Sequence, residues 1–514
     1  MEILKIDVPI GGHIVFSNEH GGRIIMNKQN SSEDKSLSVN VKDFGAMGDG
    51  KSDDSKAIQT AINYAHTNGY NVFIPKTQNS YNLHNILLLK EGVSLYSNGA
   101  QINRKFSRVV SGWAVFLEGD NEINGINYNG GNRDIPLDLS TNEFIYYADF
   151  VTDRSGKLPT RFLNNVFDHS CGTFILGNSE NVLVKNNIFK DYLDHAVYFG
   201  GRNYERKISG NIIVDGNTFT TSDLSTREAV KVRNGMNVFL LINNIMDLPK
   251  AAFSTFDVGD SVVSPQSNSN ITLSGNIGYC SRFTLFNGGV NNTFTNNNIN
   301  IFGNNVTCND YVISLGGLPT TPTNQRSTVV KNANISQNVF KTSYRFSILN
   351  GDLSGSIDNL NIINNIIEIG NQSVLFFLLG NIKFLNFSGN TVLSNKLSFS
   401  EKGYFDFSKN YDNKSVFSPT VTGTIIIHNN SFSGKIQSII YDDSSASSNS
   451  LSAIKWNFDL LGNTMISDTN KIPVNIVGTY AHTIKTSCRI QETRLIGGTQ
   501  GVNKYKNFVD DRSF

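Results

Sequence analysis

Hydrophobic and polar residues alternate over short stretches of the chain, and one phrase recurs between them. In this phrase an apolar alternation ends at an Asn, which is usually followed two positions later by a large apolar side chain, as in Asn165-Val166-Phe167. The steps between copies range from 22 residues, Asn165 to Asn187, to 40 residues, Asn298 to Asn338. The phrase is therefore constant, and the loops between copies vary. Its copies are Asn165, Asn187, Asn217, Asn244, Asn276, Asn298, Asn338, Asn365, Asn390, Asn430 and Asn463.

A repeat of this length with irregular insertions is typical of a solenoid. Val, Ile and Phe with a period of two indicate that each unit consists of strands. A helical solenoid would instead require Leu and Ala at a spacing of 3.6 residues. An Asn suits the turn of such a unit, because Asn tolerates left-handed backbone angles and its amide can bond to the next copy, about 4.8 Å away. The pattern therefore predicts a parallel β-helix.

A second alignment follows from the strand that comes after each phrase. It places a set of apolar residues in one column, which we expect to face the interior because no charge occurs in it: Ile175, Phe199, Val232, Phe256, Phe286, Leu315 and Leu349. The neighbouring column is mixed and is predicted to face outward: Tyr198, Lys231, Thr255, Leu285 and Ser314.

The most specific motif lies near the N-terminus. A strand-like run from Val39 enters a Gly48-Asp49-Gly50 turn and leads into an amphipathic helix that begins near Ser55. In this helix Ala57, Ile58, Ala61, Ile62 and Ala65 share one face. Such a helix can cover the open first rung of a solenoid, where unpaired backbone would otherwise promote aggregation. We expect the acidic residues Asp49, Asp53 and Asp54 to be structural, with Asp53 or Ser52 capping the helix.

This segment resembles the N-terminal cap of the pectate-lyase-like superfamily, the right-handed β-helices of polygalacturonase relatives and bacteriophage tailspike depolymerases. The match runs from about Val39 to Pro75, with Val72-Phe73-Ile74-Pro75 as the first strand. The resemblance implies an all-β fold, a right-handed parallel β-helix with an N-terminal capping helix. It is weak evidence for chemistry, because hydrolases, lyases and binding proteins share this fold.

The tailspike branch is favoured by three features: no pattern of a signal peptide at the N-terminus, a short segment ahead of the cap, and the chain length of 514 residues. That branch implies a homotrimer on a virion tail that cleaves bacterial capsular or O-antigen polysaccharide. We expect three parts, an anchor-like segment and linker (1–38), the β-helix with its cap and an insertion (39–465), and a C-terminal β segment (466–514). Residues 1–38 would contact a phage tail or baseplate protein.

The composition excludes several other classes. The net charge is +1 with no basic block, which argues against nucleic acid as a partner, and no window of 18 apolar residues indicates a membrane span. The four cysteines show no CxxC spacing and are interpreted as small buried hydrophobes. The eight His residues are scattered, so we expect no metal and no other cofactor.

Glycoside hydrolysis requires two carboxyl groups, about 5–5.5 Å apart for retention or about 6.5–9.5 Å apart for inversion. The densest acid cluster is Asp191-Tyr192-Leu193-Asp194-His195, followed one rung later by Arg227-Glu228. The alignment places His195 under Glu228 and Asp194 under Arg227. We predict Asp194 and Glu228 as the catalytic pair, with Asp191 as the substitute.

The side chains around this cluster are predicted to bind substrate: His195, Tyr198, Arg202, Lys231, Arg233, Asp257 and Arg282. Asp257 with Asp260 is the second candidate for the acid pair, and Arg282 and Arg345 fall in the His195 column. Surface ion pairing explains the same residues without any activity. Moreover, strict alternation from Phe199 would turn His195 and Glu228 inward, unless the preceding turn changes the parity.

Three other functions remain open. A polysaccharide lyase would use Lys231, Arg233 or His195 as the base against a uronic acid, with Ca²⁺ neutralising the carboxylate. A secreted or cell-associated enzyme would share the fold and lack the virion anchor. A receptor-binding spike without activity would not need the acids at all.

Overall fold

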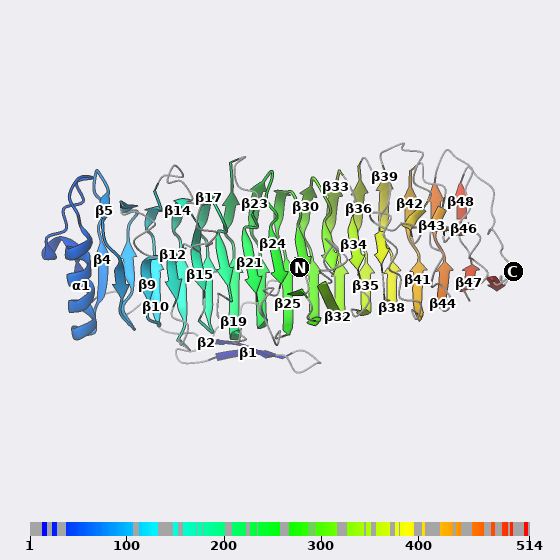
Figure 1. Ribbon diagram of the computed structural model, residues 1–514, viewed down its shortest axis with the longest axis horizontal. Coiled ribbons are helices and arrows are strands. Elements are labelled where there is room, and N and C mark those ends of the chain that lie inside the picture. Colours follow the sequence, from blue (N-terminus) through cyan, green and yellow to red (C-terminus); the bar gives the residue numbers. More distant parts are fainter. Residues whose placement is uncertain are drawn as a thin grey trace.

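The computed structural model describes separate segments that are spread over the whole length of the chain. The described residues are 13–17, 23–27, 37–105, 113–131, 148–152, 158–170, 172–177, 179–200, 208–222, 227–233, 235–257, 267–286, 289–290, 293–315, 326–343, 346–350, 356–370, 376–379, 381–394, 403–406, 422–434, 438–443, 455–466, 474–477, 486–491, 494–496 and 508–511. They form one elongated solenoid, with the helix α1 (Ser55–Asn68) at one end and the last strands at the other (Figure 1).

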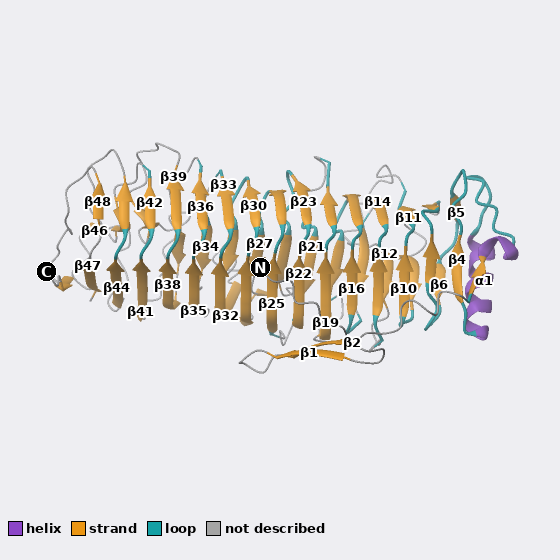
Figure 2. Ribbon diagram, turned by 180° about the vertical axis from the view of Figure 1, so that it is seen from behind, coloured by secondary structure: helices purple, strands orange, loops and turns teal. Residues whose placement is uncertain are grey.

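Three parallel sheets run along the solenoid, and successive strands of the chain visit them in turn (Figure 2). Sheet I contains, in order of pairing, β3 (Ser38–Asn40), β4 (Asn71–Ile74), β7 (Leu95–Ser97), β10 (Asn121–Asn124), β13 (Thr160–Leu163), β16 (Val182–Lys185), β19 (Ile208–Asp215), β22 (Met236–Ile242), β25 (Asn268–Ser274), β29 (Thr293–Phe302), β32 (Arg326–Ser336), β35 (Ser356–Ile363), β38 (Asn381–Ser388), β41 (Thr422–His428), β44 (Lys455–Leu461), β47 (Thr486–Gln491) and β49 (Phe508–Asp511).

Sheet II contains β5 (Tyr81–Leu83), β8 (Gln101–Arg104), β11 (Asn127–Asn129), β14 (Val166–Ser170), β17 (Ile188–Tyr192), β20 (Thr218–Thr220), β23 (Ile245–Leu248), β26 (Ile277–Cys280), β30 (Asn305–Cys308), β33 (Val339–Thr342), β36 (Ile366–Ile369), β39 (Thr391–Ser394), β42 (Ser431–Ser433), β45 (Thr464–Ile466) and β48 (Arg494–Ile496).

Sheet III contains β6 (Leu87–Leu89), β9 (Trp113–Leu117), β12 (Ala148–Thr152), β15 (Thr173–Gly177), β18 (Val197–Phe199), β21 (Val230–Arg233), β24 (Ser254–Asp257), β27 (Thr284–Phe286), β31 (Ile313–Leu315), β34 (Ser347–Asn350), β37 (Phe376–Leu379), β40 (Gly403–Asp406), β43 (Ser438–Asp443) and β46 (Val474–Val477).

Two short pairings stand outside this parallel pattern. The strand β28 (Gly289–Val290) pairs antiparallel with β32, and β1 (His13–Ser17) pairs antiparallel with β2 (Arg23–Asn27). All other pairings between the described strands are parallel, which confirms the predicted right-handed parallel β-helix. Within the described residues no helix is long and apolar enough to cross a membrane.

The helix α1 begins where the sequence places it and covers the first rung. Its apolar face, including Ile58, Ala61 and Ile62, is fully buried. The preceding acids are bound to backbone: the Asp49 carboxylate accepts the N–H groups of Lys51 and Ser52, and Asp54 accepts those of Met47 and Gly48. These acids therefore hold the turn in place, as expected from the sequence.

The N-cap of α1 is Asp54, so the expected cap by Asp53 or Ser52 was wrong, although Asp53 supports the first turn. Its Oδ1 accepts the backbone N–H and the hydroxyl of Ser55. Burial tends to raise the pKa of Asp53, but the hydrogen bonds from Ser55 outweigh it, and the pKa is lowered. This carboxylate thus stays ionised to hold the helix start against the solenoid.

A ladder of buried Asn side chains connects successive rungs along the turn between sheets I and II. In one typical step, the Asn187 Oδ1 accepts the backbone N–H of Asn165 at 2.9 Å and the Asn165 Nδ2 at 2.9 Å. The Asn187 Nδ2 in turn donates to the carbonyl of Phe162 at 2.8 Å and to the Oδ1 of Asn217 at 3.0 Å. Each amide therefore bonds in both axial directions, and the ladder continues to Asn463.

The ladder differs from the prediction at one rung. The ladder residue above Asn276 is Asn304, whose Oδ1 accepts from Asn276 N and Nδ2 at 3.0 and 2.9 Å. Asn298 lies inside β29 with φ of 53° and donates to the Oδ1 of Asn270 instead. The sequence prediction was therefore wrong for Asn298. The strand β29 contains several Asn residues, and the Asn six residues before the turn was aligned in place of Asn304-Asn305-Val306, which has the apolar residue two positions after the Asn.

The left-handed residue is also not the ladder Asn itself. The residue just before it has positive φ, for example Asn164 (56°), Gly303 (64°) and Gln337 (55°). At Gly275 and Gly462 the side chain of an Asn one rung below would also clash with a Cβ atom. Two successive residues of the turn thus have different roles: the first adopts the left-handed backbone angle, and the second makes the hydrogen bonds between rungs.

The aligned apolar column of sheet III is correct except at its first member. Phe199, Val232, Phe256, Phe286, Leu315 and Leu349 follow one another in register. Ile175 pairs with Val197, and Gly177 is the residue that pairs with Phe199. A Cβ at Gly177 would lie 2.6 Å from the Phe199 ring, so glycine leaves the space that this ring fills.

The parallel pairing continues beyond residue 465, where the sequence pattern ends. β46, β47 and β48 pair in register with β43, β44 and β45, although among the described residues the ladder bonds end at Asn463. Of the four cysteines, Cys280 and Cys308 are buried and unoxidised, as expected for small hydrophobes. They lie in register on adjacent rungs with their Sγ atoms 3.7 Å apart.

Replacing Asn304 by Ala tests the ladder at the rung that the sequence misplaced. The change removes a buried amide that bonds to the carbonyl of Leu273 and to both neighbouring ladder residues. Buried donors and acceptors left unpaired each cost about 1–3 kcal/mol, so we expect a loss of about 3 kcal/mol in the free energy of unfolding, measured by guanidinium denaturation. Asn305→Ala, at the exposed neighbouring position, is the control and should cost under about 0.5 kcal/mol. Equal effects of the two changes would contradict the ladder.

Candidate active site

The turns that lead into sheet III change the inward–outward alternation of side chains. The Ala229 carbonyl accepts the N–H groups of both Ala196 and Val197, so two successive residues face one carbonyl, as at a β-bulge. Both Ala196 and Val197 belong to the buried apolar core. Because two consecutive side chains point inward, the residue before them, His195, points outward. The inward–outward alternation counted from Phe199 is therefore interrupted before Val197, and it does not turn His195 inward.

His195 lies between two carboxylates on adjacent rungs. Its Nε2 is 3.5 Å from Asp194 Oδ1, and its Nδ1 is 3.6 Å from Glu228 Oε2. The Nδ1 is also 2.8 Å from the backbone carbonyl of Glu228. A carbonyl only accepts hydrogen bonds, so Nδ1 carries the proton in this arrangement. The free lone pair of a neutral His195 then lies on Nε2, facing Asp194.

The two carboxylates differ in their second partners. Asp194 is approached by Arg227 Nε at 3.8 Å and by the Thr173 hydroxyl at 3.5 Å. Glu228 accepts from the Thr255 hydroxyl at 3.1 Å and lies 3.8 Å from Lys231 Nζ. The side chains of Asp194 and Glu228 are 26% and 19% exposed, so solvent reaches both, whereas His195 is 5% exposed.

Lys231 keeps Glu228 ionised. Burial raises the pKa of Glu228, but the charges of Lys231 and then His195 outweigh burial and lower this pKa to about 2. A carboxyl with such a pKa does not hold a proton at neutral pH. Glu228 can therefore serve as a base, a nucleophile or a fixed negative charge, and it is unsuited to be the general acid.

His195 is neutral at neutral pH, and here burial outweighs the neighbouring charges. Burial lowers its pKa, and the nearby charges of Asp194 and Glu228 only partly oppose this. With its proton on Nδ1, the neutral imidazole can only accept a proton at Nε2, which lies 3.5 Å from Asp194 Oδ1. The arrangement thus supplies one ionised carboxylate, Glu228, and a second carboxyl group beside a proton acceptor.

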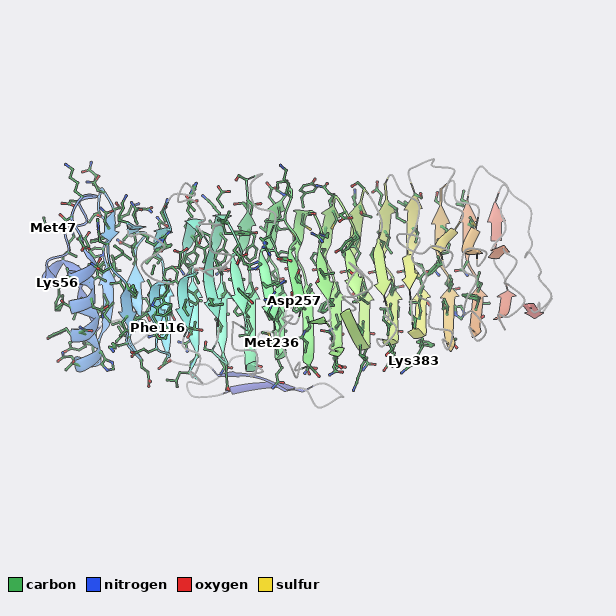
Figure 3. All side chains as sticks on the ribbon, in the orientation of Figure 1. Met47, Lys56, Phe116, Met236, Asp257 and Lys383 are labelled. Atoms are coloured by element: carbon green, nitrogen blue, oxygen red, sulfur yellow. The ribbon has the colours of Figure 1, made fainter. Side chains whose placement is uncertain are left out.

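Asp257 is held by two cations and is less available for chemistry. Its Oδ2 is 2.7 Å from Lys231 Nζ, and its Oδ1 accepts from Arg233 Nε at 3.0 Å. Burial raises the pKa of Asp257, but Lys231 and Arg233 outweigh it and lower the pKa. Figure 3 labels Asp257 near the middle of the solenoid. The predicted substrate-binding residues Lys231 and Arg233 thus meet at Asp257, and Arg233 also lies 5.8 Å from the Tyr198 ring centre.

A column of outward residues extends the cluster along the axis. Counting two residues back from the paired positions of sheet III places five residues in line: His195, Glu228, Ala252, Arg282 and Tyr311. Arg282 Nη1 donates to the Tyr311 hydroxyl at 3.1 Å, and Arg282 Nε lies 4.0 Å from Asp310. Between Glu228 and Arg282 the column carries only the methyl group of Ala252. An ionised carboxylate and a guanidinium therefore face each other across one small residue.

Asp191 belongs to a neighbouring cluster at the end of β17. Its Oδ1 accepts the N–H of Ser222 at 2.6 Å. Ligand atoms of Asp168, His169 and Asp191 lie within 4.8 Å of one another, and Asp168 Oδ1 is 2.6 Å from His169 Nδ1. These three groups are partly exposed and could approach a single cation. The expectation that no metal is required stays a prediction.

Some predicted residues lie outside the described residues, namely Arg202, Asp260 and Arg345. Others were missed by the sequence analysis: Thr255 as a partner of Glu228, Ala252 as the small residue of the column, and Tyr311 as the partner of Arg282. The register of sheet III contains the signal for the last two, because both stand two residues before a paired position.

Comparisons with known proteins agree with this architecture. Residues 38–252 match the family model described as rhamnogalacturonase A/epimerase, pectate lyase-like. The plasmin and fibronectin-binding protein A of Streptococcus pneumoniae is 34% identical over 201 residues, which cover 36% of this chain and 24% of that protein. The chain spans about a quarter or less of the length of the curated relatives it matches.

Solved structures resemble the chain in fold at low sequence identity. An exopolygalacturonase from Thermotoga maritima has a TM-score of 0.52 at 13% identity, over 70% of this chain and 92% of that chain. The tailspike protein of E. coli bacteriophage HK620, in complex with a pentasaccharide, has a TM-score of 0.57 at 12% identity, over 94% of this chain and 82% of that chain. The capping helix and the all-parallel sheets show that this chain is a right-handed parallel β-helix, and its residues 38–252 are similar to the pectate-lyase-like family model.

Proposed function

We propose that this chain is a tailspike-type depolymerase that binds bacterial capsular or O-antigen polysaccharide and cleaves it by glycoside hydrolysis. The observation that carries the proposal is the outward placement of His195 between Asp194 and Glu228 on adjacent rungs. The structural neighbours, a tailspike with a bound pentasaccharide and an exopolygalacturonase, support action on a polysaccharide.

The two carboxyl groups would have different roles. Glu228, ionised because of Lys231, would activate water or stabilise the positive charge that develops on the sugar ring. Asp194 would act as the general acid, beside the Nε2 of His195 at 3.5 Å. Arg282, across Ala252, would contact the sugar on the far side of Glu228. Asp191 is the substitute acid if Asp194 proves structural.

A lyase or epimerase is the second candidate, favoured by the description of the family model and by a neutral His195 next to the cation Arg282. His195 would then remove a proton from a uronic acid whose carboxylate Arg282 neutralises. Lys231 is less available as the base, because its Nζ lies 2.7 Å from the Asp257 carboxylate. Unsaturated products that absorb in the ultraviolet, or activity lost in a chelator and restored by Ca²⁺, would favour this candidate.

Two further alternatives differ from the proposal in where the protein acts or in whether it cleaves the polysaccharide. A secreted or cell-associated enzyme would act without a virion, and a binding spike would release no fragments. The pneumococcal relative, named for binding plasmin and fibronectin, gives the binding alternative some weight. Assembly on a virion tail through residues 1–38 is proposed from the resemblance to the tailspike branch. Mass spectrometry of capsular polysaccharides incubated with the protein separates all of these cases.

A homotrimer is proposed from the resemblance and from an apolar stripe on sheet II. Along its outward face Ile188, Ile245, Ile277 and Ile366 are 37–56% exposed, and all four belong to one register column. Thr218 and Asn305 separate these isoleucines within the column, and a row of exposed apolar side chains on one face is typical of an interaction surface. Contact between copies along the stripe would cover it.

Replacing Asp194 by Asn or Glu228 by Gln should reduce turnover of the matching polysaccharide at least about a hundredfold, since general acid–base groups contribute 10²–10⁴-fold. Activity is measured at a temperature at which circular dichroism shows each variant to be folded. Asp247→Asn, an exposed acid on sheet II, is the matched control and should retain wild-type turnover. Near wild-type rates in both site variants would place the chemistry elsewhere.

The ionisation of Glu228 predicts a pH-dependent contribution to stability. Its pKa of about 2 lies below its ordinary value of 4.5, so its stabilising effect is present above pH 4.5 and is lost as pH falls toward 2. Wild-type protein should therefore exceed Glu228→Gln in free energy of unfolding by at most about 3 kcal/mol at pH 7, and the gap should close between pH 4.5 and 2. Glu368→Gln, which breaks a more exposed pair with Lys341, should give a gap under about 1 kcal/mol. A gap that does not change with pH would contradict the assignment.

The apolar stripe predicts the assembly state. Wild-type protein should have the mass of a trimer by light scattering, and the double change Ile245→Lys with Ile277→Lys should give a folded monomer, because charge on the stripe opposes burial. Leu393→Lys, at a less exposed position of the neighbouring column, is the control. A monomeric wild-type mass would refute the trimer.

A further inference from the structure

A polar hollow lies on the outward face of sheet II near the N-terminal end, apart from the cluster on sheet III. Its volume is about 640 Å³, within the range of small-molecule sites. Residues 76–80, between β4 and β5, form one side, and outward residues of β8, β11 and β14 form the rest. Its side chains are mainly amides, including Asn79, Gln101, Asn103, Asn127 and Asn129, with one cation, Lys76.

The amides of the floor are arranged by the register of the strands. Gln101 pairs with Asn127, and Asn103 pairs with Asn129, so amides form two neighbouring columns. Gln101 Nε2 donates to Asn103 Oδ1 at 3.0 Å, and Asn103 Nδ2 donates to the Ser80 hydroxyl at 2.9 Å. These bonds fix the orientation of the amides within the hollow.

Several polar atoms of the hollow have no protein partner among the residues described here. Asn127 donates through Nδ2 to the Gly99 carbonyl at 3.3 Å, which leaves its Oδ1 open. Asn129 accepts the Gly131 N–H at 2.9 Å, which leaves its Nδ2 open. The hollow therefore offers donors and acceptors side by side, as a ligand rich in hydroxyl groups requires.

The chemistry of the lining selects among ligand classes. A phosphate or sulfate would require several cations, and the lining has only Lys76 beside the carboxylate of Asp168. An apolar ligand would require an apolar lining, which is absent from the described side chains of the hollow apart from Val166 and the ring of Tyr128. Sugar hydroxyls both donate and accept, and they match amides in alternating orientation.

We infer that this hollow is a second glycan-binding site, which holds neutral, hydroxyl-rich sugar units of a polysaccharide. Asp168 lines the hollow and also lies within 4.8 Å of the Asp191 carboxylate, three residues from Asp194. From β8 to β17 there are three strand steps, roughly 14 Å along the axis. One polymer strand would thus reach both places. The inference rests on the proposed function only for the identity of that polymer.

The test is a double change, Gln101→Ala with Asn127→Ala, compared with the wild type on an immobilised array of bacterial capsular and O-antigen oligosaccharides. Binding to at least one oligosaccharide should weaken at least tenfold, because two groups that contact hydroxyls are removed. Asn305→Ala is the matched control, because Asn305 stands exposed in the same column of sheet II several rungs away, and its binding should equal that of the wild type. The array is repeated with Glu228→Gln, which leaves the hollow intact.

The outcomes separate this inference from the proposed function. If the protein cleaves no polysaccharide and yet binds an array glycan through Gln101 and Asn127, the hydrolase proposal fails and the glycan site stands. If Glu228→Gln abolishes cleavage while the double variant binds every glycan as the wild type does, the hollow is not a glycan site. Weakening of equal size in Asn305→Ala would also overturn the inference.

Discussion

The structure depends on pairing the backbone of every buried turn between sheets I and II. A parallel solenoid stacks these turns on one another, and each turn leaves an N–H group in the interior without a strand partner. The side chain of the ladder Asn one rung further on accepts that N–H, as Asn187 does for Asn165 and Asn304 does for Asn276. Apolar burial fills the core, but these amides determine how one rung is placed on the next.

Much of the fold could be predicted from the sequence, because the ladder recurs where the spacing of strands requires it. The error at Asn298 shows the limit. Asn298 is one of several Asn residues in β29, whereas the true turn residue, Asn304, follows the left-handed Gly303. The error at Ile175 has a packing cause, since the ring of Phe199 fills space left by Gly177. Both features depend on three-dimensional contacts that a one-dimensional pattern does not contain.

The sequence predicted which residues of the candidate site lie close together, and it predicted less well what role each residue has. The alignment brings His195 under Glu228 because the register of sheet III is regular from β18 onward. It gave no indication that a bulge turns His195 outward, or that Lys231 holds Glu228 ionised while also binding Asp257. Close acids in sequence suggest raised pKa values, whereas the structure adds a cation that reverses the direction for Glu228.

The ladder also has a polarity, since every Oδ1 points toward the preceding rung and accepts from it. Removing a rung from the C-terminal side would leave two donors, the backbone N–H and the Nδ2 of Asn430, without their acceptor on Asn463. Removing a rung from the N-terminal side, for example that of Asn165, would leave the Oδ1 of Asn187 without its donors and one Nδ2 hydrogen without the Phe162 carbonyl, so only one donor would lose its acceptor. The two ends of the solenoid are therefore not equivalent toward fraying, and the capping helix covers only one of them.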